Sequence, residues 1–454
     1  MFHSISLSNR PRLAQERRDR VKRTNANTAV GRFKRVFSER ELNRLGKEVR
    51  YCQRERVVTP FRLVMAMLST LSSRKVETLA DLQRGFNALF GESLAYKPFH
   101  NQLSKRGFAE FMRACVERLV EKLVLNVLKI KKGHAFSEFR RIVIQDGSSF
   151  AVKDSLGDVF PGRFKRVSPA AVELHVSMDL LSEALEHITL TPDTFGERAE
   201  LPDPGSLSGC LLLADRGYFS LPYVGEMIKA GASFVLRTKT NLNPLVVNAY
   251  GKAGKRLRRW CGKPLQEVLE GFPKKTPVDL DVCWQSAESH LSCRLVVSYH
   301  PKAREFRFLL TNLPRTRYAA EQIGLAYKLR WQIELLFKEW KSYANLHAFD
   351  TGKSEIAEGL IWAAIAAATV KRYLAHLTQH LAQVDISTRK VAMCAHHVMG
   401  ALVEGLLDGR LSRIRRAINN AVAFLATNAR RAHPKRDRRS GRLELNLEPV
   451  FNAA

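Results

Sequence analysis

Three acidic residues occupy positions from which their carboxylates could meet: Asp146, Asp215 and Glu334. The first two each follow a short apolar run that predicts a β-strand, with a glycine one or two residues later. We expect the first run to stop at an Asp-Gly turn, so that both aspartates lie at the rim of a sheet. Converging carboxylates repel one another unless cations lie between them, and hard ions such as Mg²⁺ prefer oxygen ligands. A pair of such ions suits in-line phosphoryl transfer.

Glu334 lies in residues 327–341, which we expect to form one α-helix. At about 100° per residue, four polar side chains project from one arc of about 60°: Tyr327, Arg330, Glu334 and Lys341. A separate apolar face, which a packed helix would bury, holds Leu329, Ile333, Leu336 and Trp340. This pattern suits a carboxylate that holds a cation while its neighbours hold phosphates. The alternative is a solvated face with ordinary i,i+4 charge pairs. The two aspartates have plain alternatives as well, a turn and a surface ion pair.

Charge and composition indicate the kind of partner. The chain has 454 residues and a formal net charge of +30, from 74 Lys and Arg against 44 Asp and Glu. Such a surplus attracts polyanions, nucleic acid first and acidic membrane second. The longest apolar run, residues 360–370, is too short to span a bilayer and predicts a buried helix. The seven cysteines are scattered without a C-x-x-C pair, which favours a reducing cytosol. We expect a cytoplasmic protein that binds a nucleic-acid backbone and no membrane.

The pattern along the chain predicts three regions. Residues 1–135 begin with a basic segment, residues 1–40, which we expect to be a flexible arm or frayed helix that meets DNA. The small helices after it fit a helix-turn-helix-like DNA reader or an ordinary helical domain. Residues 136–350 alternate between strands and helices, with a β-rich part at about 240–314. Residues 351–454 are helical and end in a basic tail. The predicted fold class is therefore α/β, with helical N- and C-terminal regions.

The residues singled out above resemble a known family. The spacing of Tyr327, Arg330, Glu334 and Lys341 matches the Y-x2-R-x3-E-x6-K signature of the DDE transposases of bacterial insertion sequences, in the branch often called the IS-four family. The blocks Asp146-Gly147-Ser148 and Asp215-Arg216-Gly217-Tyr218 are also similar to that family. The long gap between Asp215 and Glu334 leaves room for the β-rich insertion that this branch places there. The similarity covers roughly residues 142–341.

The resemblance implies a ribonuclease-H-like catalytic core interrupted by that insertion. In it, Asp146, Asp215 and Glu334 would be the catalytic residues and would bind two Mg²⁺ or Mn²⁺ ions. The implied substrate is double-stranded DNA, both transposon ends and target. Water first attacks a phosphodiester at each element end, and the freed 3′-OH then attacks the opposite strand or target DNA. A homodimer in the DNA complex is expected because two ends must be paired, in the nucleoid of a bacterial cytoplasm.

Further DNA contacts are implied in the same way. Tyr327, Arg330 and Lys341 would contact phosphates at the transposon end, with Arg330 offering a planar fork and Lys341 a point charge. We add their basic neighbours Arg216 and Lys338.

A tryptophan of the insertion is a candidate for base flipping. Some members of the family flip a base onto such a residue, and stacking suits that task. Trp284 is our candidate and Trp260 the second. The alternation Val278, Leu280, Val282, Trp284 also fits a core tryptophan on a strand.

Two other functions stay open beside a cut-and-paste transposase. One is a related metal-dependent DNA nuclease that cuts without joining. The other is a non-catalytic DNA-binding protein in which the carboxylates only tune charge. An RNA-binding protein is disfavoured, because no stretch shows an aromatic-rich RNP-like pattern. Other aspartates near the first strands do not end clean apolar runs, and we expect them in turns or on the surface: Asp154, Asp158, Asp179 and Asp193.

Overall fold

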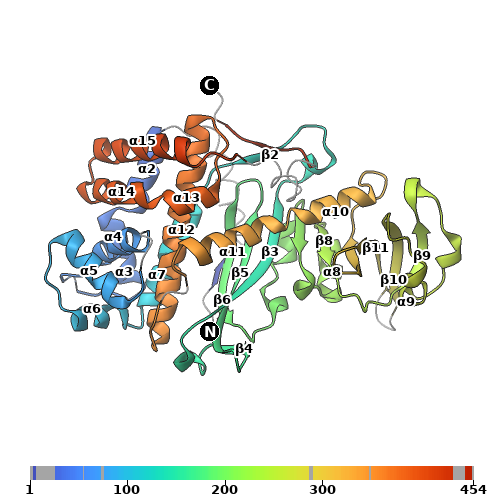
Figure 1. Cartoon of the computed structure of the whole chain (residues 1–454), viewed down its shortest axis with the longest axis horizontal. Helices are drawn as coiled ribbons and strands as arrows, with labels where there is room; N and C mark the ends of the chain where they lie inside the picture. The colour runs from blue at the N-terminus through green and yellow to red at the C-terminus, as the bar shows by residue number, and fades with distance from the viewer. Residues whose placement is uncertain are drawn as a thin grey trace.

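One mixed sheet crosses the middle of the molecule, with most helices gathered at one end of it (Figure 1). The computed structural model describes residues 4–6, 26–54, 56–72, 76–285, 290–346, 349–432 and 445–451. The strand order within the sheet is β1-β6-β5-β3-β7-β8-β12-β11-β10-β9, and β4 pairs with β5.

The central part of this sheet combines an antiparallel meander with two parallel strands. Its strands are β3 (Ile142–Ala151), β5 (Ser168–Asp179), β6 (Ala184–Pro192), β7 (Leu211–Ala214) and β8 (Ser233–Arg237). β3 pairs antiparallel with β5 and parallel with β7, and β7 pairs parallel with β8. All four residues of β7 are buried, as expected for a parallel strand covered on both faces. This arrangement is the ribonuclease-H-like core that the family resemblance implied.

The strand that carries Asp146 is longer than expected. We expected it to stop at a turn at Asp146-Gly147, and that prediction is wrong. β3 runs on to Ala151 because residues 146–151 stay paired with β5. The strand that ends here is its parallel partner, whose last paired residue, Ala214, lies opposite Gln145. The strand end beside Asp146 is therefore the end of β7 and not the end of β3.

The β-rich insertion continues the same sheet. It comprises β9 (Leu245–Tyr250), α9 (Leu265–Val268), β10 (Val278–Gln285), β11 (His290–His300) and β12 (Glu305–Thr311). β12 pairs antiparallel with β8, and β11, β10 and β9 follow in order. Val278, Leu280 and Val282 are buried in a hydrophobic core that the insertion shares with β7 and β8, so the predicted apolar face of β10 is confirmed.

Helices from both ends of the chain pack into one helical body. The N-terminal ones are α2 (Ala26–Val36), α3 (Glu39–Glu48), α4 (Pro60–Leu71), α5 (Leu79–Phe90), α6 (Tyr96–Leu103) and α7 (Phe108–Lys122). The C-terminal ones are α12 (Ser354–Ala382), α13 (Thr388–Cys394), α14 (His396–Asp408) and α15 (Leu411–Asn428). α12 contacts α4 and α7, and α15 contacts α2. The predicted burial of residues 360–370 is confirmed, because α12 lies at the centre of this body. No described helix has the length and apolar character that a bilayer crossing needs.

Part of the expected flexible arm is folded. α2 buries Ala29, Val30 and Phe33, and Arg32 donates a hydrogen bond to the carbonyl of Val124 at 3.0 Å. The expectation of a flexible arm is therefore wrong for residues 26–40, because one face of α2 is apolar. Ser4–Ser6 forms β1, which pairs with β6. Residues 7–25 of the arm, and residues 435–442 of the basic tail, lie outside the described residues.

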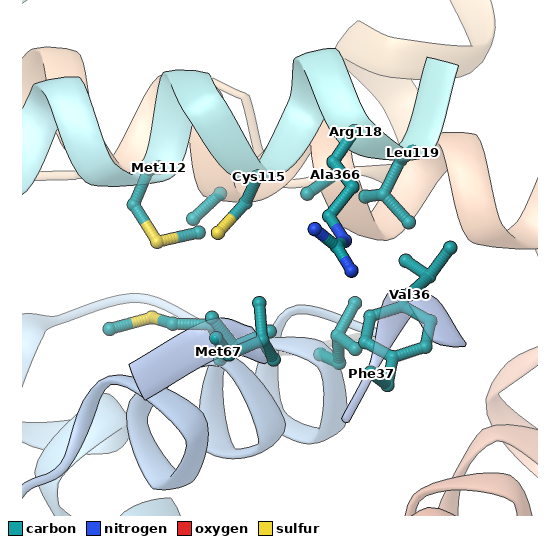
Figure 2. A pocket seen from close by; sticks show the side chains of 12 residues that line it. Val36, Phe37, Met67, Met112, Cys115, Arg118, Leu119 and Ala366 are labelled. Atoms are coloured by element: carbon teal, nitrogen blue, oxygen red, sulfur yellow. The ribbon is translucent and has the colours of Figure 1, made fainter. Parts of the chain in front are cut away.

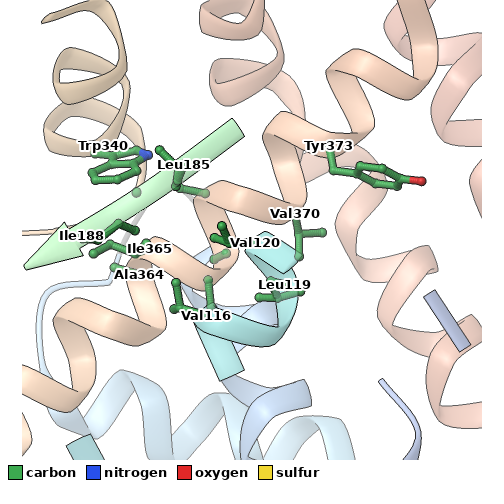
Figure 3. Close-up of a cluster of buried hydrophobic side chains, with 14 of the residues drawn as sticks. Val116, Leu119, Val120, Leu185, Ile188, Trp340, Ala364, Ile365, Val370 and Tyr373 are labelled. Atoms are coloured by element: carbon green, nitrogen blue, oxygen red, sulfur yellow. The ribbon is translucent and has the colours of Figure 1, made fainter. Parts of the chain in front are cut away.

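A hydrophobic cluster joins the sheet to the helical body (Figure 3). Trp340 of α11 (Trp331–Tyr343) lies beside Leu185 and Ile188 of β6, and Val120 of α7 and Ile365 of α12 complete the contact. All five side chains are buried. α11 is thus anchored on the sheet at one end by ordinary core packing.

A small apolar cavity remains inside the helical body (Figure 2). Met112 and Cys115 of α7 face Met67 of α4 and Phe37 across it. Arg118 also lines the cavity, but its guanidinium bonds the Arg35 carbonyl at 2.9 Å and Glu41 at 3.3 Å. This lining suits neither a metal ion nor a phosphate, so the candidate site lies elsewhere.

Candidate active site

Asp146 and Asp215 lie side by side where two parallel strands diverge. Gln145 of β3 pairs with Ala214 of β7, and each aspartate is the next residue along the chain. Neighbouring strands lie about 4.8 Å apart, so the two aspartates start from adjacent backbone positions. Arg237 occupies the corresponding position on the next strand, because the residue before it, Leu236 of β8, pairs with Ala214. Its Nη1 lies 3.8 Å from Oδ1 of Asp215.

The segment that carries Glu334 is two helices rather than one. α10 (Ala320–Lys328) and α11 are separated at Leu329 and Arg330, so the prediction of a single helix is wrong. Both residues keep right-handed helical dihedrals, and i→i+3 hydrogen bonds replace the usual i→i+4 bonds at this point. The predicted apolar face is buried as expected: Leu329, Ile333, Leu336 and Trp340. α11 crosses the sheet in front of β5 and β3, and α10 lies over β8 (Figure 1).

The break directs Arg330 between two carboxylates. Its Nη1 donates to Asp146, and its Nη2 donates to Glu334 at 2.8 Å. The Tyr327 hydroxyl donates to Oδ1 of Asp215 at 2.9 Å. The structure therefore brings together five of the residues selected from the sequence, the three acids and two of their assigned DNA contacts.

The other three assigned DNA contacts lie around this centre. Lys341 donates from Nζ to the Ser149 carbonyl at 2.6 Å, so it is fastened to β3. Lys338 and Arg216 are exposed. The Lys338 ammonium lies 4.8 Å from the ring centre of the exposed Trp331. Lys338 and Arg216 are thus free to meet a large anion, whereas Lys341 already has a partner.

The two aspartates have opposite electrostatic surroundings. Burial raises the pKa of Asp146 to about 7; the positive charge of Arg330 opposes this shift, and the negative charges of Asp215 and Glu334 add to it. Burial alone would also raise the pKa of Asp215. There, however, the hydrogen bond from the Arg216 amide and the nearby Arg330 charge prevail and lower the pKa below the ordinary aspartate value. Strongly perturbed carboxyl groups at one edge of a sheet are typical of functional sites.

The donor chemistry of the site fits a hard divalent cation. Its candidate ligands are carboxylate oxygens alone, the set that Mg²⁺ and Mn²⁺ favour. Among the described residues no three His, Cys, Asp or Glu side chains converge on one point. Between Asp146 and Glu334 the positive charge is supplied by Arg330. Asp146, Asp215 and Glu334 are the residues that could hold a metal ion here.

Comparisons with known proteins identify the family of this chain. The family model described as "Transposase DDE domain" matches residues 137–370, which include all three acids. The chain belongs to the DDE transposase family.

Curated relatives extend the match beyond this domain. The transposase is 21% identical over 437 residues to the transposase for insertion sequence element IS231E of Bacillus thuringiensis subsp. finitimus, covering 86% of this chain and 89% of the relative. It is 21% identical over 357 residues to the transposase for IS1151 of Clostridium perfringens, covering 71% and 75%. A shorter match, 40% identical over 82 residues, joins it to the putative transposase InsL for IS186A of Escherichia coli and covers 18% and 22%. Its relatives are thus transposases of bacterial insertion sequences.

The two candidate tryptophans of the transposase lie within its insertion. Trp284 is half-buried on β10 and packs against the insertion core. Trp260 is buried, and its ring centre lies 4.5 Å from that of Phe272. Trp284 is therefore the more accessible of the two, and base flipping onto it stays a prediction.

Several residues near the site were missed or misplaced by sequence reasoning. Arg237 could have been found, because it ends a third apolar strand with a charge. Asp179 is buried at the end of β5, so expecting it in a turn or on the surface is wrong, whereas Asp193 lies in a turn as expected and is buried there. Asp193 accepts hydrogen bonds from Ser149 and from the Arg163 amide, partners that come from distant parts of the sequence.

Proposed function

We propose that this transposase cleaves and joins DNA at the terminal inverted repeats of an insertion sequence, by a cut-and-paste route. Asp146, Asp215 and Glu334 are its catalytic residues. The observation that carries the proposal is the adjacency of Asp146 and Asp215 at the divergence of β3 and β7, with Glu334 joined to Asp146 through Arg330. Both aspartates follow directly after the last residues of β3 and β7 that pair with each other, and Glu334 lies on α11 of the matched domain.

The three carboxylates would hold two Mg²⁺ or Mn²⁺ ions. When bound, such ions activate the attacking oxygen and stabilise the leaving oxygen of an in-line displacement. Asp146, Asp215 and Glu334 would supply the carboxylate oxygens that bind them. Tyr327 fixes the orientation of the Asp215 carboxylate through its hydroxyl, and Arg330 fixes those of Asp146 and Glu334.

Basic residues around the acids would receive the DNA backbone. Nε of Arg330 is buried and has no hydrogen-bond partner among the described residues, so Arg330 would have to shift before it could donate to a phosphate oxygen. Lys338 and Arg216 are exposed cations beside the site. Lys341 would act from its place on β3. Trp284 would stack a flipped base, and a homodimer would pair the two element ends.

The direct test uses purified protein, its cognate element ends and Mg²⁺. We expect nicks at the element ends and joined products with target DNA, both abolished by Glu334→Gln. Absence of nicking and joining, or full activity of the Glu334→Gln protein, would overturn the proposal. Nicking without any joined product would indicate the related nuclease instead. Metal-independent binding with no cleavage, unaffected by Asp146→Asn, would indicate a non-catalytic DNA-binding protein.

A further inference from the structure

On the face of β3 that points away from Arg330, Gln145 precedes Asp146 with a buried side chain, and the residue that follows Asp146 has none. Gly147 occupies that position, and it pairs across the sheet with His175 of β5. A β-carbon on Gly147 would lie 2.7 Å from Oε1 of Glu173, 3.0 Å from the Tyr218 hydroxyl and 3.3 Å from Nδ1 of His175. The first two distances are too short for ordinary contact. Only glycine leaves room for these groups.

The side chain that occupies this space is that of Tyr218, from the loop that begins at Asp215. Tyr218 lies three residues after Asp215, at the end of the short helix η5 (Arg216–Tyr218). Its hydroxyl reaches over β3 and lies 2.9 Å from Nδ1 of His175. His175 Nε2 lies 3.0 Å from the Thr191 hydroxyl on β6. The loop after β7 is thus tied across β3 to the two strands beyond it.

These tied groups are fully enclosed. Tyr218, His175 and Thr191 are buried, and burial lowers the pKa of His175 to about 4. The imidazole is therefore neutral at neutral pH, with one ring nitrogen donating and the other accepting. Buried hydrogen bonds of this kind are costly to leave unmade, so the link holds the loop in one place.

We propose that Tyr218, His175 and Gly147 form a clasp that sets the position of Asp215 relative to Asp146. They are positioning residues, because none of them contacts the reacting atoms, and the inference rests on the proposed role of the two aspartates. The clasp works through the backbone: Gly147 is bonded to Asp146, and Tyr218 anchors the turn that begins at Asp215.

Gly217, the second glycine near the aspartates, also lies against the side chain of another residue. A β-carbon on Gly217 would lie 1.3 Å from Oε2 of Glu197, so the Glu197 carboxylate fills the space over this residue. Glu197 begins the short helix η3 (Glu197–Glu200), which follows β6. The Glu197 carboxylate therefore packs against the turn between Asp215 and Tyr218, while Arg216 of the same turn stays exposed.

The test compares the same substitution at two buried tyrosines. Tyr218→Phe removes the hydroxyl of the clasp and keeps the ring. Tyr223→Phe is the matched control: Tyr223 lies on α8 (Leu221–Lys229), and its hydroxyl bonds the Pro202 carbonyl at 2.6 Å. For each protein we would measure the melting temperature, binding to cognate ends in EDTA, and cleavage rate against Mg²⁺ concentration.

We expect Tyr218→Phe to raise the half-saturating Mg²⁺ concentration, or to lower the cleavage rate, by about 10- to 100-fold relative to Tyr223→Phe. DNA binding in EDTA should stay within about twofold of the control. Equal metal dependence and rate in the two variants would overturn the clasp while leaving the proposed function intact. If the wild-type protein itself neither nicks nor joins DNA, the proposed function fails first.

A second variant covers the case in which Tyr218→Phe does not fold. His175→Gln keeps one donor and one acceptor on a side chain of similar reach, whereas His175→Leu removes both. Partial recovery of Mg²⁺ affinity in the glutamine variant relative to the leucine variant supports the clasp. Equal Mg²⁺ affinity in two folded His175 variants would overturn it.

Discussion

The two faces of β3 contact different groups at the neighbouring residues Asp146 and Gly147. On the face under α11, Asp146 shares Arg330 with Glu334 and lies beside Asp215. On the opposite face, Gly147 gives its space to Tyr218 and His175. Successive residues of a strand point to opposite faces, so one step along the chain separates a charged centre from an enclosed polar layer.

The contrast between the two faces of β3 shows how a charged site can be held in place. The front face gathers acids that repel one another, and the cation Arg330 partly compensates for that repulsion. The back face is buried and is linked by neutral groups and hydrogen bonds across β3, β5 and β6. Changes on the front should therefore alter chemistry with little loss of stability, and changes on the back should alter geometry and stability together.

The largest expected effect comes from the front face. Glu334→Gln removes one negative ligand, and losing several kcal/mol of transition-state stabilisation lowers the cleavage rate by about a thousandfold or more. The melting temperature should change little. Single-turnover cleavage of cognate ends measures the effect, with Glu321→Gln on the exposed side of α10 as the matched control. A Glu334→Gln protein that cuts as fast as the control would remove Glu334 from the site.

A back-face change should cost both rate and stability. Gly147→Ala inserts a methyl group against Glu173 and Tyr218, which we expect to destabilise the fold by about 1–3 kcal/mol and to slow cleavage by about 10- to 100-fold. Chemical denaturation and cleavage assays measure the two effects. The control is Gly225→Ala on α8, where a β-carbon meets nothing within 4 Å. Unchanged activity at Gly147→Ala would abolish the contrast between the faces.

The free energy of unfolding should depend on pH through the titration of the Asp146 carboxyl group. Its pKa is about 7 in the folded protein against an ordinary 3.8, so the folded state holds a proton that the unfolded chain has released. This carboxyl therefore destabilises the fold as pH rises from about 4 to above 7. In EDTA, Asp146→Asn should gain roughly 1–4 kcal/mol relative to wild type between about pH 5 and pH 8. Denaturant unfolding checks it, with the exposed Asp158→Asn as control; a pH-independent difference would contradict it.

The smallest effects are expected at the exposed cations. Lys338→Ala and Arg216→Ala should each weaken DNA binding a few-fold and reduce the salt slope of binding by about 1, without sequence preference. Titrations of cognate and unrelated DNA at several salt concentrations measure this. Lys129→Ala, on the short strand β2 (Leu128–Ile130), is the control. An unchanged salt slope would place these cations away from the DNA path.

Much of the fold was predictable because it depends on local pattern. The apolar run at residues 360–370 is buried in α12, and the alternation from Val278 to Trp284 lies on β10. Errors arose where distant partners decided the outcome, as when pairing with β5 carried β3 past Asp146.

The sequence alone determined which residues could do chemistry, because residue type and spacing along a strand or helix are local properties. Asp146, Asp215 and Glu334 could be named without any coordinates. Only the tertiary structure decided how they meet: the parallel register of β3 and β7 set the aspartates side by side, and the break between α10 and α11 placed Arg330 between acids. The link from Tyr218 over Gly147 to His175 could not be predicted, since three strands must first come together before those groups are neighbours.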